Sequence, residues 1–83
     1  MHPVHKYSFD EPATYCICIN GTLDKTWFRD LYDLEISVKK RAGGDQETIL
    51  KGEMKDQATL IGVLNTLYNM GFTLFSVERI VES

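Results

Sequence analysis

The feature that most constrains this chain is a run of 21 residues, 57–77, that contains no charged side chain. A run of this length could cross a bilayer as a helix, because about 20 apolar residues span its hydrocarbon core. However, seven of the 21 are Gln, Thr, Asn or Ser, and Asn69, Met70 and Gly71 are typical of a helix end. The run therefore predicts a water-soluble helix followed by a buried strand, and no membrane partner.

Apolar residues in the first half of this run have helical spacing. Asp56 is the predicted N-cap of the helix, and Gly71 is its predicted left-handed stop. The strand that follows, over residues 72–81, is apolar on both faces, so the pattern leaves open which face is the core. The predicted buried face of the helix consists of Leu60, Ile61, Leu64, Leu67 and Tyr68.

The rest of the chain predicts three further strands and one helix. Residues 15–20 and 34–39 alternate like half-buried strands, and 46–53 should return from a turn at 42–45 as the second arm of a hairpin. Between the first two strands, residues 24–32 predict a short helix that buries Trp27, Phe28 and Leu31. The face of the first strand predicted to be buried carries Tyr15, Ile17 and Ile19.

The order β-α-β-β-α-β predicts an α+β, ferredoxin-like sandwich with a four-stranded antiparallel sheet. Right-handed crossovers would place both helices on one face of that sheet. Residues 1–12 form the predicted N-terminal arm, and residues 13–83 form the single ferredoxin-like domain.

Composition excludes several functional classes. The net charge of -3 gives no general attraction to phosphate backbones, which argues against a nucleic-acid partner. The first six residues have no apolar run of the kind that a signal peptide needs, so we expect a cytoplasmic protein. Cys16 and Cys18 are expected to be reduced thiols that serve as small apolar side chains. Neither a metal site nor a cofactor site is expected, because the carboxylates are scattered and both histidines lie in the arm.

Four segments also resemble a family of small uncharacterised bacterial proteins. They lie at 19–27, 48–52, 56–64 and 71–78, and together they follow the order G-x-L-D-x-x-W, T-x-L-x-G, D-Q-A-x-L-x-G-x-L and G-x-x-L-x-S-V. That resemblance implies no known activity. The helix and strand over residues 60–74 are also similar to the first helix and strand of amino-acid-sensing ACT modules, which implies a ligand-sensing role.

The main functional hypothesis is self-association as a homodimer. The strands at 15–20 and 72–81 are apolar on both sides, whereas helices on one face shelter only one side of a sheet. The predicted outward face of the second helix holds small uncharged residues where a solvated helix usually carries Lys and Glu. The residues expected at the interface are Cys16, Cys18, Thr59, Gly62, Thr66, Asn69, Phe75 and Val77.

Three alternatives remain open at this point. Val4, Tyr7 and Phe9 of the arm could fold back and cover the sheet instead of a second copy. The chain could bind a small molecule near its helix starts, where Asp24, Trp27, Asp56 and Gln57 are the candidate residues. It could also be a small dimeric enzyme with a pocket between sheet and helices, although no catalytic residue stands out.

Overall fold

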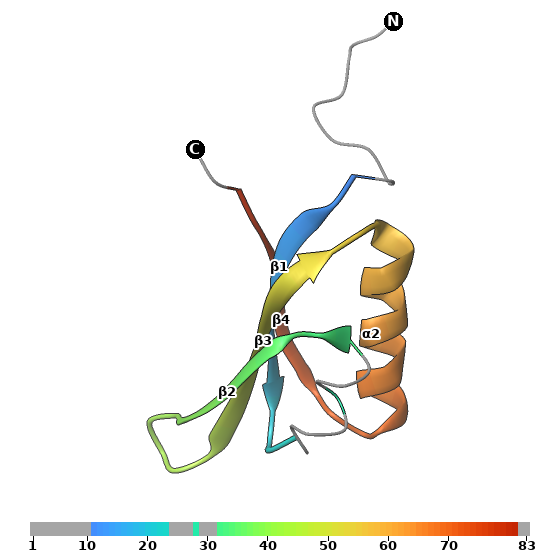
Figure 1. The fold of residues 1–83 in the computed structure, drawn as a ribbon. Coiled ribbons are helices and arrows are strands. Elements are labelled where there is room, and N and C mark those ends of the chain that lie inside the picture. The colour runs from blue at the N-terminus through green and yellow to red at the C-terminus, as the bar shows by residue number, and fades with distance from the viewer. Residues whose placement is uncertain (1–10, 24–27, 29–31, 82–83) are drawn as a thin grey trace, which may run out of the picture.

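The computed structural model describes residues 11–23, 28 and 32–81 of the chain. Within them, the elements follow the order β1 (Ala13–Asn20), β2 (Glu35–Lys40), β3 (Gln46–Met54), α2 (Gln57–Asn69) and β4 (Leu74–Ile80). The strands form one twisted layer, and α2 lies against one side of it (Figure 1). The described residues therefore have an α+β fold with an open antiparallel sheet.

The sheet has the strand order β2-β3-β1-β4, and each neighbouring pair of strands is antiparallel. β1 is paired on both sides, with β3 along its whole length and with β4 from Thr14 to Ile19. This central position fits its sequence, because an inner strand needs large apolar side chains on its covered face. β2 and β4 are the two edges of the described sheet.

The core lies between α2 and the face of the sheet that α2 covers, which we call the inner face. Thr48 is the buried polar residue of this core, and its hydroxyl donates a hydrogen bond to the Gly21 carbonyl oxygen. That bond satisfies a hydroxyl that would otherwise be costly to bury. The inner face contributes Tyr15, Ile17, Ile19, Ile36, Leu50 and Met54, and α2 contributes Leu60, Val63 and Leu67.

Both ends of α2 are set by the residues that the sequence predicts. The Asp56 carboxylate accepts hydrogen bonds from the Thr59 backbone N–H and hydroxyl, each at 2.8 Å, as an N-cap should. Gly71 has φ of 90°, and its N–H donates to the Tyr68 carbonyl while the Phe72 N–H donates to the Leu67 carbonyl. These two bonds form a Schellman motif, which ends the helix at a left-handed glycine.

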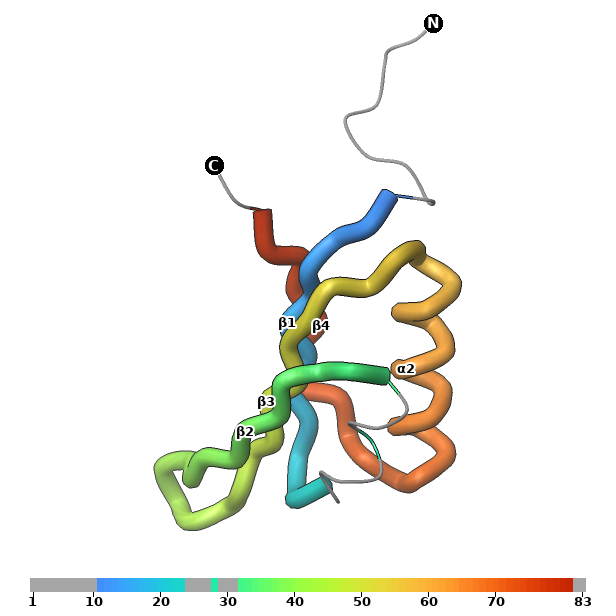
Figure 2. Tube along the Cα trace, viewed as in Figure 1, coloured from blue at the N-terminus to red at the C-terminus, as the bar shows by residue number. Residues whose placement is uncertain are grey.

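The predicted hairpin is also confirmed. The Arg41 N–H donates to the Asp45 carbonyl at 2.7 Å, and the turn uses positive φ at Gly43 and Gly44. β2 and β3 therefore pair from Glu35 with Lys51 to Lys40 with Gln46. In the tube view, the tip of this hairpin extends away from α2 (Figure 2).

The predicted first helix falls on residues that the structure describes only in part. Phe28 and Tyr32 have helical backbone and pack together with ring centroids 5.0 Å apart, and Phe28 is fully buried. Residues 24–27 and 29–31, which include Asp24, Trp27 and Leu31, lie outside the described residues. Residues 1–10 of the predicted arm, with Val4, Tyr7 and Phe9, also lie outside them.

The predicted buried face of α2 is wrong by part of a turn. Ile61 and Tyr68 were expected in the core, but Ile61 is 54% exposed and Tyr68 is 78% exposed. Val63 occupies the core in their place and is fully buried. The spacing of apolar residues could not fix the rotation of the helix, because apolar side chains occupy more of its circumference than the sheet covers.

The two faces of β4 are set by an irregularity in its pairing with β1. Val77 pairs with Ile17 and Ser76 pairs with Cys18, but Ile19 pairs with Leu74, so Phe75 is an extra residue at this point. A bulge of this kind interrupts the simple alternation of side chains along a strand. Alternation in the sequence therefore could not show which residues of β4 face the core.

Candidate functional site

A hollow on the inner face lies between α2 and β4. We call it the α2–β4 groove, and its volume is about 300 Å³. The helix supplies one wall and the start of β4 the other, while β1 forms the floor. Its lining residues are Ile19, Leu64, Asn65, Leu67, Tyr68, Phe72 and Leu74.

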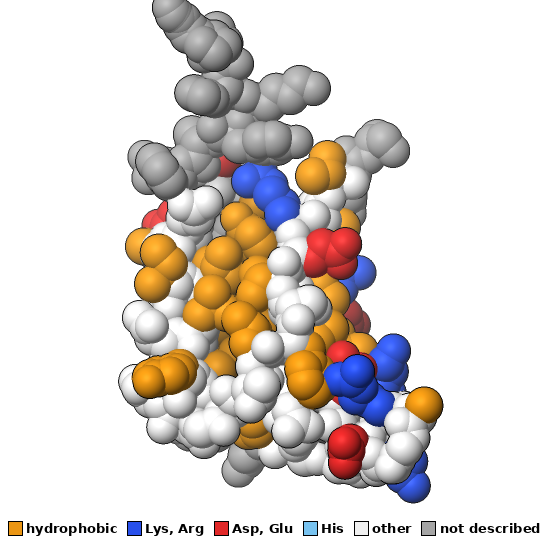
Figure 3. Space-filling view, turned by 180° about the vertical axis from the view of Figure 1, so that it is seen from behind, with side chains coloured by type: hydrophobic (Ala, Val, Ile, Leu, Met, Phe, Trp, Pro, Cys, Tyr) orange, Lys and Arg blue, Asp and Glu red, His pale blue; other side chains and the backbone are white. Residues whose placement is uncertain are grey.

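Apolar side chains around this groove are open to solvent. Leu74 is 48% exposed and Val77 is 38% exposed, although both lie on strand β4 beside the buried residues of β1. Hydrophobic side chains form a continuous band down the middle of this side of the molecule, and most charged side chains lie to one side of it (Figure 3). Contiguous exposed apolar surface of this kind is typical of an interaction site.

The groove is bordered by an edge strand. In the described sheet, β4 pairs with β1 on one side only, so the backbone groups on its other side have no strand partner there. An edge that offers backbone donors and acceptors next to an apolar groove can accept another strand. β4 and the α2–β4 groove thus form one surface with both backbone and side-chain features.

The outer face of the sheet has a different character. One row across all four strands contains Glu35, Lys51, Cys16 and Glu78. Opposite charges at paired positions, such as Glu35 and Lys51, are mutually favourable and suit a solvated surface. Cys16 and Cys18 are the less polar residues of β1 on this face. The Arg41 guanidinium lies 4.2 Å from the centre of the Phe75 ring, and Phe75 is 42% exposed.

Cys16 and Cys18 lie half-buried on the outer face as free thiols. Burial raises the pKa of the Cys16 thiol above its usual 9.0, and the nearby Cys18 thiol and Glu78 carboxylate raise it further. The thiol form therefore dominates at neutral pH, which disfavours Cys16 as a nucleophile. No group of three or more His, Cys, Asp or Glu side chains able to hold a metal ion lies within the described residues.

The small residues of α2 do not share one environment. The Tyr32 hydroxyl lies 2.9 Å from the Thr66 hydroxyl and donates to the Gly62 carbonyl at 3.4 Å, so a residue of the same chain packs on this part of the helix. Thr59 is half-buried and bonds to Asp56, whereas Asn69 is exposed at the helix end. The structure does not bring these four residues together with Phe75 and Val77 on one surface.

The four residues predicted to bind a ligand do not form a described cluster, and Asp56 has a structural role. Asp56 is the N-cap, and its hydrogen bonds from Thr59 lower the pKa of its carboxyl below the usual 3.8. Gln57 is the first residue of α2 and is half-buried. Asp24 and Trp27 lie outside the described residues, so the four candidates are not assembled into a described site.

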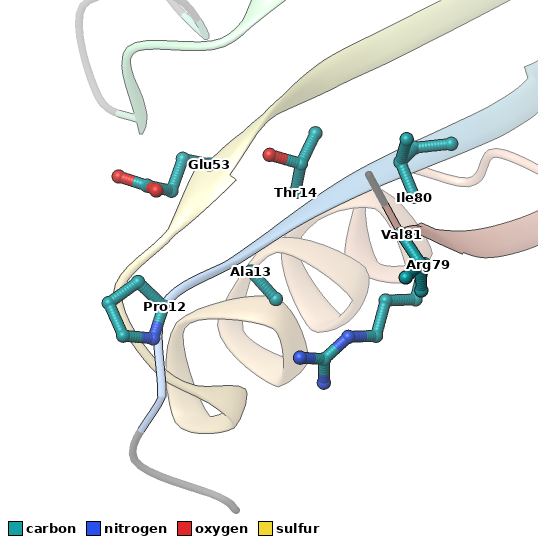
Figure 4. A pocket seen from close by; sticks show the side chains of 7 residues that line it. All are labelled: Pro12, Ala13, Thr14, Glu53, Arg79, Ile80 and Val81. Atoms are coloured by element: carbon teal, nitrogen blue, oxygen red, sulfur yellow. The ribbon is translucent and has the colours of Figure 1, made fainter. Parts of the chain in front are cut away.

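A second hollow lies where β1 begins and β4 ends, and it has a volume of about 220 Å³. Glu53 and Arg79 are its charged lining residues. In close view, Arg79 and Ala13 point to the side of the sheet where α2 lies, whereas Thr14, Glu53 and Ile80 point to the opposite side (Figure 4). These side chains do not converge on one point, as the groups of a catalytic site must.

Sequence reasoning singled out none of the lining residues of the groove as site residues, and Val77, which it did single out, lies farther along β4. Tyr68 was assigned to the core, Leu74 was placed on a strand whose core face was left open, and Asn65 was not considered. The available signal was the run without charge, because a solvated helix normally carries Lys or Glu on its exposed face. In α2 the exposed positions are instead Ala58, Ile61, Asn65, Tyr68 and Asn69.

A family model described as a domain of unknown function (DUF8691) matches residues 14–78. The match extends from β1 to the middle of β4 and includes both walls of the groove. No curated protein and no solved structure shows significant similarity to the chain. No helix among the described residues has the length and apolar character needed to cross a membrane.

Proposed function

The chain belongs to the DUF8691 family, whose description assigns no activity, and we propose that it is a non-enzymatic, self-associating interaction module. The observation that carries this proposal is the α2–β4 groove with its exposed Tyr68 and Leu74, together with the exposed Val77 farther along β4. Burial of apolar surface contributes roughly 25 cal/mol per Å², so covering this groove would be favourable. The outer face, with its rows of paired charges, is a poorer docking surface.

The proposed occupant of the groove is a second copy of the chain. In a two-fold dimer the same patch meets itself, so each charge on the patch would lie near its own copy. The run from Gln57 to Val77, which supplies most of this surface, has no charge that could repel itself in this way. The free thiols of Cys16 and Cys18 fit a reducing compartment such as the cytoplasm.

Sedimentation of matched variants tests this proposal. The unmodified chain should sediment at micromolar concentration with about twice its 9.5 kDa mass. Leu74→Ser, which alters the groove wall, should weaken the dimer about tenfold or more, because it removes an apolar contact on both copies. Val38→Ser is the control, since Val38 is a half-buried aliphatic residue of the other edge strand, β2. A monomer at all concentrations would contradict the proposal.

The proposed complete architecture is the ferredoxin-like sandwich with two helices on the inner face. Two observations support it. The strand order β2-β3-β1-β4 puts β3 between β1 and β2, as in a split β-α-β unit, and Phe28 and Tyr32 are helical. NMR chemical shifts of residues 24–32 would test it, because a continuous helix gives uniformly helical values and an irregular loop does not.

A second candidate function is the binding of a small apolar molecule in the groove, in the manner of an ACT-like sensor. Its volume of about 300 Å³ is at the lower end of the range for ligand pockets, and Asn65 and Tyr68 offer polar groups. A small enzyme would need titratable groups at that site, and the described lining has no carboxylate, His or Cys. Native mass spectrometry of the purified chain would reveal a retained ligand as added mass.

A further inference from the structure

We infer that the second copy docks edge to edge, with β4 of one copy antiparallel to β4 of its partner. The two copies of Val77 then lie directly opposite each other across the two-fold axis. This inference rests on the proposed function and specifies the surface and the register of the dimer. It would join the two sheets into one continuous sheet across the axis. The backbone groups on the open side of β4 would then be paired.

Symmetry restricts the possible registers. A two-fold axis perpendicular to the sheet reverses the strand direction and keeps the faces of the sheet, so α2 of both copies lies on the same side. Directly opposite residues of antiparallel strands point to the same face. The axis must therefore lie midway between the two copies of one β4 residue, so that this residue is directly opposite itself. It cannot lie level with the bond between two residues.

Length and charge favour Val77 among these positions. Val77 is the middle residue of Leu74–Ile80, and an axis there pairs Ser76 with Glu78 on the regular side of the bulge, whereas an axis at Ser76 would set Phe75 of the bulge opposite Val77. An axis at Glu78 would place two carboxylates directly opposite each other, and an axis at Arg79 would do the same with two guanidinium groups. Like charges directly opposite each other destabilise a strand pair. With Val77 on the axis, each Glu78 lies opposite the partner's Ser76.

The same register brings the two grooves together. Val77 pairs with the fully buried Ile17, so its side chain points to the inner face, where α2 lies. The two Val77 side chains would contact each other on the floor between the two copies of α2. Ile61 and Tyr68, the most exposed apolar residues of the described helix, would border this joint surface.

A cysteine on the axis tests the register directly. In a chain carrying Cys16→Ser and Cys18→Ser, Val77→Cys should give a disulfide-linked dimer under mild oxidation. Directly opposite residues have Cα atoms about 4.5–5.5 Å apart, which a disulfide can bridge. The control is Ser37→Cys in the same background, because Ser37 is an exposed residue of the other edge strand, β2.

A charge pair gives a second and independent test. Ser76→Glu would place a carboxylate opposite the partner's Glu78 twice in each dimer, and we expect it to weaken association about tenfold. Ser76→Glu combined with Glu78→Lys should restore association, because opposite charges then face each other. Ser37→Glu is the matched control, since Ser37 and Ser76 end the same row, Ser37-Ile49-Cys18-Ser76, at opposite edges.

The outcomes separate this inference from the proposed function. A sedimenting dimer that forms the Val77→Cys cross-link and shows loss and rescue with the charge pair supports the β4 register. A sedimenting dimer with no cross-link and no response to Ser76→Glu overturns the register while self-association stands. A chain that is monomeric at all concentrations overturns the proposed function and this inference with it.

Discussion

The two edge strands of the sheet differ in how many charged residues they carry and in how well their inner residues are buried. β2 carries three charged residues among its six, Glu35, Lys39 and Lys40, and its inner residue Ile36 is buried. β4 carries two charged residues among its seven, and its inner residue Val77 is 38% exposed beside the groove. Charged side chains, lysine above all, protect an edge against pairing with another chain. β2 is therefore closed to a partner by its own sequence, and β4 is less well protected.

The packing of the core beneath the two edges also differs. Ile36 and Val77 end the same inner row, Ile36-Leu50-Ile17-Val77. Phe28 and Leu34 are buried members of the core with Ile36, so the chain itself completes the packing at that end of the row. At the other end, the groove between α2 and β4 remains uncovered. The chain has more apolar sheet surface than its described elements cover, and the excess is at β4.

The largest expected difference between the edges comes from the two ends of this row. Ile36→Ala should lower the free energy of unfolding by about 2–5 kcal/mol, because it leaves a cavity in a closed core. Val77→Ala should cost about 1 kcal/mol or less in the monomer, since its side chain is already partly hydrated. Urea unfolding at submicromolar concentration, where association contributes least, measures both values.

Equal losses for the two variants would contradict the comparison, because they would mean that Val77 is as well covered as Ile36. Raising the protein concentration then sharpens the test. A ligand or partner that binds only the folded state adds stability in proportion to the logarithm of its concentration. In the Ile36→Ala variant, we expect stability to rise with protein concentration as it does in the unmodified chain. In the Val77→Ala variant, we expect a smaller rise.

A smaller effect should follow from filling space on the closed side. A Cβ added to Gly52 would lie 2.7 Å from Leu34 Cδ2, and Leu34 is only 2% exposed and has little room to move. Gly52→Ala should therefore destabilise the chain by about 1–3 kcal/mol in urea unfolding.

Gly62→Ala is the matched control for this substitution. At Gly62 the nearest atom to an added Cβ is the Tyr32 hydroxyl oxygen at 3.9 Å, so the methyl group fits. Alanine also favours a helix interior over glycine by about 0.5–1 kcal/mol. Gly62→Ala should be stabilising. If Gly52→Ala were stabilising as well, β3 would not be tightly packed against Leu34.

The sequence predicted the described strands and α2 because their signals are local. Asp56 and Gly71 mark the ends of α2 through bonds to residues within five positions, and the hairpin needs only its own glycines. The inner face of β1 was also predictable, because an inner strand alternates in step with its core. These features depend on near neighbours, and near neighbours are visible in a sequence.

The candidate site was less predictable because it depends on contacts between distant segments. The rotation of α2 decides whether Ile61 and Tyr68 are core or surface, and that rotation is set by the sheet. The bulge at Phe75 changes the face of the residues before it, and simple alternation gives no sign of it. Gly62 and Thr66 were expected to contact a partner copy, but Tyr32 of the same chain packs against them.

The smallest expected effect concerns the start of α2. This part of the molecule belongs to neither edge strand, so it serves as a reference for the comparison of the two edges. Hydrogen bonds from Thr59 hold the pKa of Asp56 below 3.8 in the folded chain, so the ionised carboxylate stabilises the fold. A carboxyl whose folded pKa is lowered contributes fully above its unfolded pKa, and this contribution is lost as the pH falls through the folded value. Asp56→Ala should lower Tm by a few degrees at neutral pH and by much less at pH values well below 3.8.

Asp56→Asn distinguishes the cap from the charge. Asparagine is as good an N-cap as aspartate and does not titrate, so its advantage over alanine should not change with pH. Thermal unfolding followed by circular dichroism at neutral and acidic pH measures the three chains together. Because the cap belongs to α2 and not to β4, sedimentation of folded Asp56→Ala should match that of the unmodified chain. A loss of association in that variant would mean that the docking surface depends on the start of the helix as well as on the edge strand.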